Sequence, residues 1–457
     1  MSEIATTTIP LASGPILALT DPASKTLHAR GIPYAIAPRF APPQPISAWT
    51  AGKDCTVPAP ICPQLPSRLE SVMGPLTAGH EQSESCLTLS VTAPLHYPPH
   101  EAPCNNNNNN SALLPVLVWF HGGAYISGGG DLACYQPLKL AEQGVVCVTV
   151  TYRLGVFGYL GLAGIAPRNL GLLDQREALL WVRSNISAFG GDPGNVTAVG
   201  QSAGADSIIC LLAAEGAKSK ELFAKAILLS PPLREIRERA VELTAELLTT
   251  KAEGLLTRDP REMDVSELLD LQKKLLMDPV RKQVMLFAPA LGEYPLPAVE
   301  EFDKRIAGAV ADIPILIGWT AHDGRPFSSM MDPFGLGSWG FYNIPLLGSV
   351  AEAAQTWYVT RSYFSWPSQE FHAYVRKFAG RSTTYEFGWA AERSKLGSCH
   401  CVDIPFVLGA EGAWDAAPML WGSGTEGDLQ RLGEGIRGLW VGFMRGEWVQ
   451  KEHLRFV

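Results

Sequence analysis

Short runs of consecutive apolar residues recur along the chain, separated by glycines, prolines and polar residues. Such runs are too short for helices and are apolar at every position. This is typical of strands in a parallel sheet that helices cover on both faces. The sequence therefore predicts strands at Val116–Phe120, Val145–Tyr152, Val196–Val199, Ala226–Leu229 and Ile313–Trp319.

Segments with helical spacing of apolar residues lie between these runs. In one of them Leu172, Leu179, Val182 and Ile186 fall on one stripe of a helix. Alternating strands and helices predict an α/β protein with a large, mostly parallel central sheet and helices on both faces. The predicted helices are 171–186, 203–212 and 433–444.

The stretch from Arg234 to about Arg281 is highly charged and helical in pattern, with no strand signal. We expect it to form a helical cap at about 231–290 over the edge of the sheet. With no internal repeat, the chain is expected to form a single domain over 1–457. The asparagine run 105–110 is polar and turn-prone, and it predicts a disordered surface loop.

Charge and composition narrow the function. The net charge of -8, with no basic cluster, argues against binding to nucleic acid or to an anionic membrane. The N-terminal residues have no basic segment followed by a long apolar core, and no stretch reaches membrane-spanning length. We expect a soluble, cytoplasmic protein and leave secretion open.

The nine cysteines contain no CxxC pair and no zinc-ribbon spacing. Buried thiols are the expected state of most of them in a reducing compartment. Cys399, His400 and Cys401 are consecutive, but three such residues cannot supply a tetrahedral set of ligands, so no metal site is predicted.

The candidate nucleophile is Ser202. A short apolar strand ends in Gly200-Gln201-Ser202-Ala203-Gly204 and a helix follows. This G-x-S-x-G pattern, between a strand and a helix, is typical of a tight turn that exposes a serine hydroxyl at the positive end of the helix. The alternative is an ordinary strand-to-helix turn with a capping serine.

A second glycine-rich turn supports the catalytic interpretation. The strand at 116–120 runs into His121-Gly122-Gly123-Ala124. Glycines allow backbone N–H groups to approach a tetrahedral oxyanion closely, and the N–H of Ala203 is a further donor. A nucleotide-binding loop is the alternative, but neither GxGxxG nor a P-loop lysine is present.

With these motifs, nearly the whole chain resembles the type-B carboxylesterase/cholinesterase family of the α/β-hydrolase fold. The resemblance is carried by Gly31-Ile32-Pro33-Tyr34-Ala35, Glu84-Ser85-Cys86-Leu87, the block 169–204, the stretch 290–297, the segment 317–327 and Gly397-Ser398-Cys399-His400. It implies oxyanion donors at Gly123, Ala124 and Ala203, and a catalytic triad completed by Asp323 and His400. It also implies a supporting role behind the triad for Ser230, whose other interpretation is a turn serine.

The chain departs from the family pattern in several places. Gln201 stands where many members have Glu, so a negative charge beside the nucleophile is missing. The loop 63–85 contains no Trp, Tyr or Phe, which makes a choline ester an unexpected substrate. The resemblance implies a disulfide between Cys62 and Cys86, although in a reducing cell this pair stays as thiols. The chain is also shorter than typical members between Pro232 and Ala288.

The acid of the triad is identified by its place in the chain. In this fold it lies between Ser202 and His400 in the chain and follows a late strand, which selects Asp323. Glu293 lies before that strand, Asp312 is at its other end, and Asp403 follows the histidine. An Asp-Gly turn without catalytic function is the other interpretation of Asp323-Gly324.

The sequence therefore predicts a serine hydrolase that cleaves a small-molecule carboxylic ester through an acyl-enzyme, without metal or organic cofactor. Two alternatives stay open: acyl transfer or lactone formation on the same triad, and a catalytically inactive binding protein. Four aromatic residues are candidates for a pocket, although core or lid packing is the simpler expectation: Tyr125, Phe327, Trp339 and Phe406.

Overall fold

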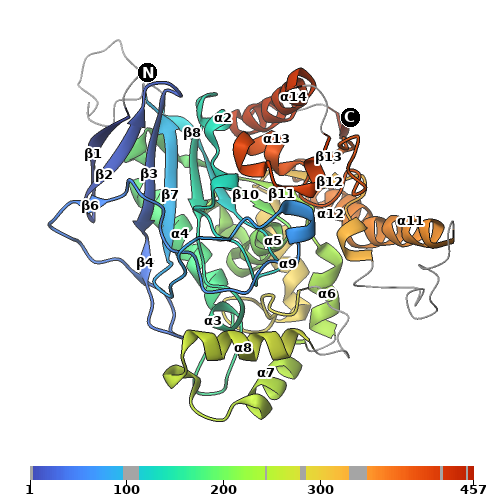
Figure 1. Ribbon diagram of the computed structural model, residues 1–457, viewed down its shortest axis with the longest axis horizontal. Helices are drawn as coiled ribbons and strands as arrows, with labels where there is room; N and C mark the ends of the chain where they lie inside the picture. The colour runs from blue at the N-terminus through green and yellow to red at the C-terminus, as the bar shows by residue number, and fades with distance from the viewer. Residues whose placement is uncertain are drawn as a thin grey trace.

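The computed structural model describes residues 4–95, 113–241, 244–277, 285–328, 347–422, 426–448 and 451–457. A large sheet with the strand order β1-β2-β3-β7-β9-β8-β10-β11-β12-β13-β14 runs through it (Figure 1). Its strands are β1 Ala5–Leu11, β2 Gly14–Asp21, β3 Thr26–Pro33, β7 Thr88–Pro94, β8 Leu114–Phe120, β9 Val146–Val150, β10 Gly191–Gln201, β11 Lys225–Leu229, β12 Ile315–Thr320, β13 Ser382–Phe387 and β14 His453–Phe456, with the short β6 Lys53–Asp54 beside β2. A separate pair is formed by β4 Ala35–Ile36 and β5 Gln44–Pro45.

The sheet is mixed. From β9 through β8 and β10 to β14 every neighbouring pair is parallel. The apolar runs predicted β8 to β12 of this part, but they did not predict β13 and β14. The strands β1, β2, β3 and β7 are antiparallel and form the N-terminal edge, which the sequence analysis did not predict. Because strands β8, β10, β11 and β12 run in one direction, the loops that follow them meet at one edge of the sheet.

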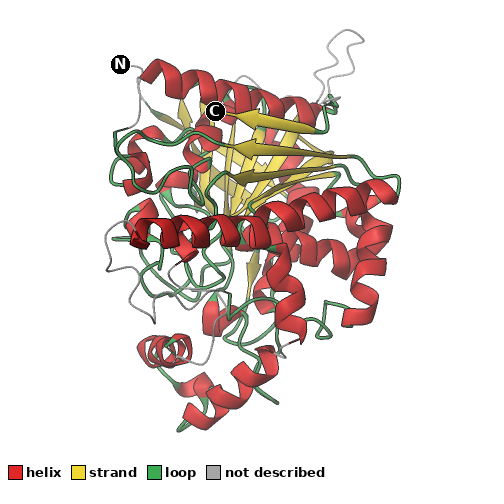
Figure 2. Cartoon of the chain, turned by 90° about the vertical axis from the view of Figure 1, so that its right-hand side faces the viewer, coloured by secondary structure: helices red, strands yellow, loops and turns green. Residues whose placement is uncertain are grey.

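Helices lie on both faces, and they flank the fanned strands in Figure 2. The longer ones are α4 Leu170–Asn185, α5 Ala203–Glu215, α6 Leu233–Val241, α7 Thr244–Leu255, α8 Val265–Leu276, α9 Val299–Val310, α11 Leu347–Val359, α12 Trp366–Lys377 and α14 Glu426–Arg445. The short ones are α1 Glu70–Met73, α2 Leu138–Ala141, α3 Gly155–Gly158 and α13 Ile404–Leu408.

Alternation along the strands produces two separate cores. On β8, Val116 and Val118 pack into a core that includes side chains of α4, α5 and α9. Leu117 and Trp119 point to the opposite face and join a core that includes side chains of α2, α13 and α14. Both sets are fully buried, which explains why this strand is apolar at every position.

The stretch predicted as a cap contains α6, α7 and α8, and the last two lie at the bottom of Figure 1. Helix α8 begins with a capping box between Asp264 and Glu267, which satisfies N–H groups at its start. Its buried residues Leu268, Leu271 and Leu275 recur at helical spacing. A role for these helices as a cap over the site stays a prediction.

Two features named in the sequence analysis, the asparagine run 105–110 and Trp339, lie outside the described residues, as does Cys104, one of the nine cysteines. Within the described residues, none of the helices has both the length and the apolar character needed to cross a membrane.

Candidate active site

Ser202 lies on the sharp turn between β10 and α5. Its φ of 54° and ψ of -119° are unusual for a residue with a side chain. The turn is held by a hydrogen bond from the Ser202 N–H to the Leu229 carbonyl at 2.9 Å, and by one from the Asp206 N–H to the Ser202 carbonyl at 2.9 Å. Strain of this kind at a serine after a strand is the geometry of a nucleophile elbow.

The two glycines of the elbow are required by close packing. A Cβ atom on Gly200 would lie 2.4 Å from the carbonyl carbon of Gly204. A Cβ on Gly204 would lie 2.0 Å from the carbonyl oxygen of Phe120, in the neighbouring strand β8. Larger residues at either position would push the turn away from the sheet, so the glycines fix the place of the serine.

His400 and Asp323 form a buried pair. The Nδ1 atom of His400 lies 2.5 Å from Oδ1 of Asp323, and the two side chains are 1% and 0% exposed. Asp323 follows β12 at the edge where the parallel strands end. Its other oxygen accepts hydrogen bonds from the Ser230 hydroxyl at 2.7 Å and from the Thr320 N–H at 3.0 Å. The carboxylate is thus held on both oxygens, with one aimed at the imidazole.

Two aromatic rings enclose the imidazole. The ring centroid of His400 lies 5.0 Å from that of Phe327 and 5.2 Å from that of Phe364. Phe364 lies in a π-helical segment, Thr360–Ser365, between α11 and α12. The same segment contacts the turn that carries the acid, because the Gly324 N–H donates to the Thr360 hydroxyl at 2.9 Å. Such π-helical insertions often occur at functional sites.

The second nitrogen of His400 contacts Gln201. The amide Nε2 of Gln201 lies 2.9 Å from Nε2 of His400 and 3.2 Å from the Cys401 sulfur. A neutral ring that donates its Nδ1 proton to Asp323 has a lone pair at Nε2, which accepts from this amide. Among the described residues, no hydrogen bond joins the Ser202 hydroxyl to His400. In the predicted mechanism, Nε2 must release the Gln201 amide before it can accept a proton from Ser202.

The loop after β8 brings backbone donors to the same place. Gly123 has a φ of 109° and Ala124 a φ of 53°. A Cβ on Gly123 would lie 2.0 Å from the Ser127 carbonyl oxygen, so glycine is required there. Within the described part of the chain, no hydrogen bond uses the N–H of Gly123, Ala124 or Ala203. Backbone N–H groups that secondary structure does not use can donate to a developing negative charge.

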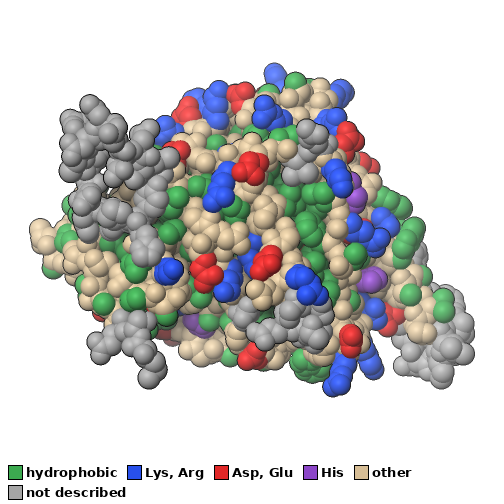
Figure 3. Space-filling model, turned by 90° about the horizontal axis from the view of Figure 1, so that it is seen from above, with side chains coloured by type: hydrophobic (Ala, Val, Ile, Leu, Met, Phe, Trp, Pro, Cys, Tyr) green, Lys and Arg blue, Asp and Glu red, His purple; other side chains and the backbone are tan. Residues whose placement is uncertain are grey.

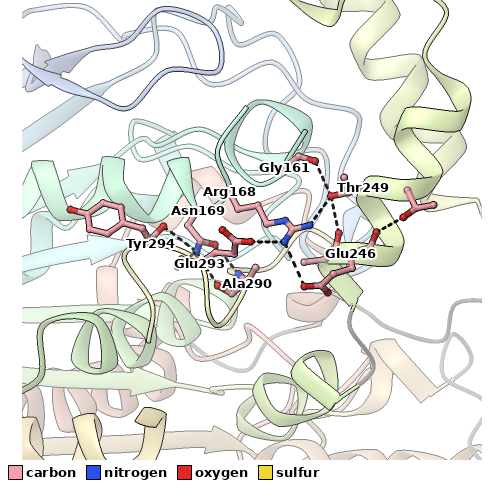
Figure 4. A network of polar contacts seen from close by, with 10 residues as sticks. Gly161, Arg168, Asn169, Glu246, Thr249, Ala290, Glu293 and Tyr294 are labelled. Carbon is pink, nitrogen blue, oxygen red and sulfur yellow. Dashed lines mark hydrogen bonds and ion pairs between the residues drawn. The ribbon is translucent and has the colours of Figure 1, made fainter. Parts of the chain in front are cut away.

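Glu293, the rival acid, lies in a different environment (Figure 4). Its side chain is 50% exposed and forms an ion pair with Arg168 at 3.0 Å. The Glu293 carbonyl accepts from the Asn169 amide at 2.9 Å, and the same amide donates to the Ala290 carbonyl. This network fastens the loop before α9, and none of its interactions involves His400.

The other two candidate acids, Asp312 and Asp403, form no ion pair with His400 among the described residues. Asp312 is 56% exposed and pairs with Lys220 at 2.9 Å, at the opposite end of β12. Asp403 is completely buried, but its oxygens have no hydrogen-bond partner among the described residues. Burial raises the pKa of Asp403 to about 7, and the negative charge of Asp323 adds to the shift. Asp323 is the acid that the structure brings to His400.

The residues 9–336 match the family model described as "Carboxylesterase family". The chain belongs to the carboxylesterase family. It is 40% identical to a probable N-octanoylanthranilate hydrolase of Rhodococcus erythropolis, over 85% of this chain and 83% of that protein. It is 36% identical to a para-nitrobenzyl esterase of Bacillus subtilis strain 168, over 91% of this chain and 85% of that protein. A solved PNB esterase structure superposes with a TM-score of 0.76 at 30% identity, over 97% of this chain and 91% of that one.

These comparisons confirm the predicted family, the α/β-hydrolase fold and the class of enzyme, a carboxylic-ester hydrolase. The roles of Ser202, Asp323 and His400 stay predictions that the geometry supports.

A pocket in this carboxylesterase lies over the turn that carries Ser202. Ser202 and His400 line it together with Gln201, and its internal volume is about 70 Å³. Most of its wall is apolar, but Arg68 and Glu235 also line it. The remaining aliphatic and aromatic wall residues are Leu69, Met73, Leu76, Ile126, Leu132, Tyr135, Met285, Phe327, Tyr363 and Phe364. An apolar wall around one polar cluster is typical of a small-molecule site.

Of the aromatic residues that the sequence suggested for a pocket, three lie among the described residues, and one of them lines the pocket. Phe327 lines the pocket. Tyr125 is fully buried and packs against Tyr159, and Phe406 packs in the core against Trp389 and Phe387. The sequence analysis missed Phe364, because nothing in the spacing of the chain indicates that a helix between β12 and β13 reaches the imidazole.

The cysteines near the site are thiols in this structure. Cys62 and Cys86 are both free and buried, and the Cys62 side chain together with burial raises the pKa of Cys86 well above its usual value. Burial raises the pKa of Cys401, beside the histidine, well above its usual value. Among the described residues, no group of His, Cys, Asp and Glu side chains has the arrangement of a metal site.

Proposed function

We propose that this carboxylesterase hydrolyses small carboxylic esters, with Ser202 as nucleophile, His400 as base and Asp323 as the acid that orients it. The observation that carries the proposal is the 2.5 Å contact between His400 and Asp323 beside a strained serine elbow. Ser202 directly follows β10 and Asp323 closely follows β12, at the edge where these parallel strands end. Ser202 and His400 line the same pocket.

The mechanism follows from these groups. His400 leaves the Gln201 amide, accepts the proton of Ser202, and the serine oxygen attacks the ester carbonyl. The N–H groups of Gly123, Ala124 and Ala203 receive the oxyanion, and each such donor typically contributes about 3 kcal/mol to transition-state stabilisation. His400 then protonates the leaving alcohol, and later removes a proton from the water that hydrolyses the acyl-enzyme.

Asp323 and its neighbours keep the base ready. The carboxylate fixes the tautomer with a proton on Nδ1 and stabilises the imidazolium when it forms. Ser230 and the Thr320 N–H hold the carboxylate from behind. Phe327 and Phe364 exclude water from the ring, which strengthens the charge interaction between His400 and Asp323.

The substrate that fits is a compact ester with apolar groups on both sides of the carbonyl, because the pocket wall is largely aliphatic and aromatic. The relative named for para-nitrobenzyl esters supports this class. A nucleic acid is not a partner we propose: the net charge is -8, and basic and acidic side chains are interspersed on the face in Figure 3. A cytoplasmic location stays a prediction.

The test is hydrolysis of a panel of 4-nitrophenyl esters of increasing acyl length by the wild type and by Ser202→Ala. We expect kcat/KM to be highest for short acyl chains and Ser202→Ala to lower kcat by about 10⁴-fold or more. Product analysis with and without an added alcohol separates hydrolysis from acyl transfer. An unchanged rate in Ser202→Ala would refute the proposed nucleophile.

A further inference from the structure

A buried polar contact joins the loop after β8, which contains Gly123 and Ala124, to helix α5, which follows Ser202. Tyr125 directly follows Ala124, and its hydroxyl oxygen lies 2.5 Å from Oδ2 of Asp206 in the first turn of α5. Both residues are 0% exposed. The phenol donates and the carboxylate accepts, and the positive end of the helix favours a negative charge at this position. Two segments that are far apart in the sequence are thereby held together next to the elbow.

The loop needs such a hold, because its backbone is bent unfavourably. Ala124 and Tyr125 have φ values of 53° and 61°, in the left-handed region that residues with a Cβ rarely adopt. Consecutive residues in this conformation persist only where their surroundings fix them. Tyr125 is fixed at both ends: its hydroxyl reaches Asp206, and its carbonyl accepts from the Gly155 N–H at 2.6 Å.

Ser207 extends the contact to the third oxyanion donor. Its hydroxyl lies 3.1 Å from the Tyr125 hydroxyl and 3.0 Å from the carbonyl of Ala203. Ala203 is the residue whose N–H, at the start of the helix, is proposed to face the oxyanion. The same small network therefore touches both segments that supply the donors, the loop at Ala124 and the helix at Ala203.

We propose that Tyr125 and Asp206 are positioning residues for the oxyanion hole. They set the N–H groups of Gly123 and Ala124 on the loop against that of Ala203 on the helix, so that all three donors meet one oxygen. Donors of this kind act only within a few tenths of an ångström of the right place. The inference rests on the proposed serine-hydrolase function of the site.

The proposal predicts a specific kinetic signature. The oxyanion exists in the transition state and not in the bound ester, so a displaced donor lowers kcat while KM changes little. Tyr125→Phe removes one oxygen and keeps the ring, which packs at 4.7 Å from that of Tyr159. We expect kcat for a 4-nitrophenyl ester to fall about 10-fold, with KM within about twofold of wild type.

A second readout isolates the oxyanion. A trifluoromethyl ketone forms a tetrahedral adduct with a serine, so its inhibition constant should rise about 10-fold in Tyr125→Phe, in parallel with the loss in kcat. Tyr34→Phe is the matched control: Tyr34 is equally buried and donates to the Thr151 carbonyl at 2.9 Å. This control should leave kcat and the ketone affinity within about twofold of wild type.

Variants of Asp206 provide a second test in case Tyr125→Phe folds poorly. Asp206→Asn retains an acceptor for the phenol and should keep most of the activity, whereas Asp206→Ala should lose as much kcat as Tyr125→Phe. The double variant Tyr125→Phe/Asp206→Ala should be no worse than either single one, because both changes break one contact. Thermal unfolding of each variant verifies that the assay is run on folded protein.

Two results would overturn the proposal. If Tyr125→Phe and Asp206→Ala keep wild-type kcat and ketone affinity while Ser202→Ala is inactive, the positioning role is wrong and the proposed function stands. If the wild type does not turn over esters and Ser202→Ala behaves identically, the proposed function and the positioning role fail together.

Discussion

Asp323 and Glu293 both lie between Ser202 and His400 in the chain, but the structure gives them opposite surroundings. Asp323 is fully buried, accepts three hydrogen bonds and contacts the imidazole at 2.5 Å. Glu293 is half exposed, and its carboxylate pairs with Arg168 in a network that joins surface loops (Figure 4). An acid can orient a base only where it is held and desolvated, and a solvated ion pair contributes little. For identifying the acid of the triad, the position of a carboxylate relative to a strand end is therefore more informative than its order in the chain.

The largest expected effect separates these two acids directly. Asp323→Asn should lower kcat by about 10⁴-fold at neutral pH, because the amide favours the wrong tautomer of the imidazole. Glu293→Gln, the matched neutral replacement, should stay within about twofold of wild type. Steady-state kinetics on one 4-nitrophenyl ester measures both. A nearly inactive Glu293→Gln with a normal Asp323→Asn would reverse the assignment.

Asp403 sharpens the comparison, since it is buried like Asp323 but lacks partners among the described residues. Its pKa is raised to about 7 in the folded protein, against an ordinary value of 3.8. A raised carboxyl pKa means that its contribution to stability is complete below about pH 4 and is lost as pH rises through about 7. The free energy of unfolding of Asp403→Asn, relative to that of the wild type, should therefore be higher at pH 8 than at pH 5, by on the order of a few kcal/mol.

Urea unfolding of wild type and Asp403→Asn at both pH values measures this difference. Comparing the two proteins at each pH cancels the opposite contribution of buried histidines such as His121, whose pKa burial lowers to about 4. The same pH dependence in both proteins would show that Asp403 does not titrate in this range.

Ser230 tests whether the hold on Asp323 matters for catalysis. Ser230→Ala removes the 2.7 Å hydrogen bond to the carboxylate and should lower kcat about 10-fold, as loss of such supporting contacts commonly does. Ser219→Ala is the control, because this buried serine donates to the Gly216 carbonyl, away from the site. Equal kinetics of the two variants would show that Ser230 is only a turn residue.

The smallest expected effect concerns the stability of the surface network. Glu293→Gln should change the free energy of unfolding by less than about 1 kcal/mol, since its ion pair with Arg168 is half exposed. The same urea experiment provides the value. A loss of several kcal/mol would mean that this network, and not only the sheet, holds the fold together.

The parallel strands β8 to β12 and the elbow could be predicted because their signals are local. Strands buried on both faces read as apolar runs, and the two elbow glycines adjoin the serine that they serve. The antiparallel edge was missed since a strand such as β1 is partly exposed and mixes Thr with apolar residues. Phe364 and Asp206 were missed because their contacts join segments far apart in the chain, and no spacing rule connects them.

The central claim is that Ser202 is the nucleophile of an ester hydrolase, and covalent labelling tests it most directly. The protein is treated with a fluorophosphonate, and peptide mass spectrometry locates the adduct. We predict one adduct, on Ser202, that is absent from Ser202→Ala and forms far more slowly in Asp323→Asn. An adduct on another residue, or none on a protein that hydrolyses esters, would contradict the claim.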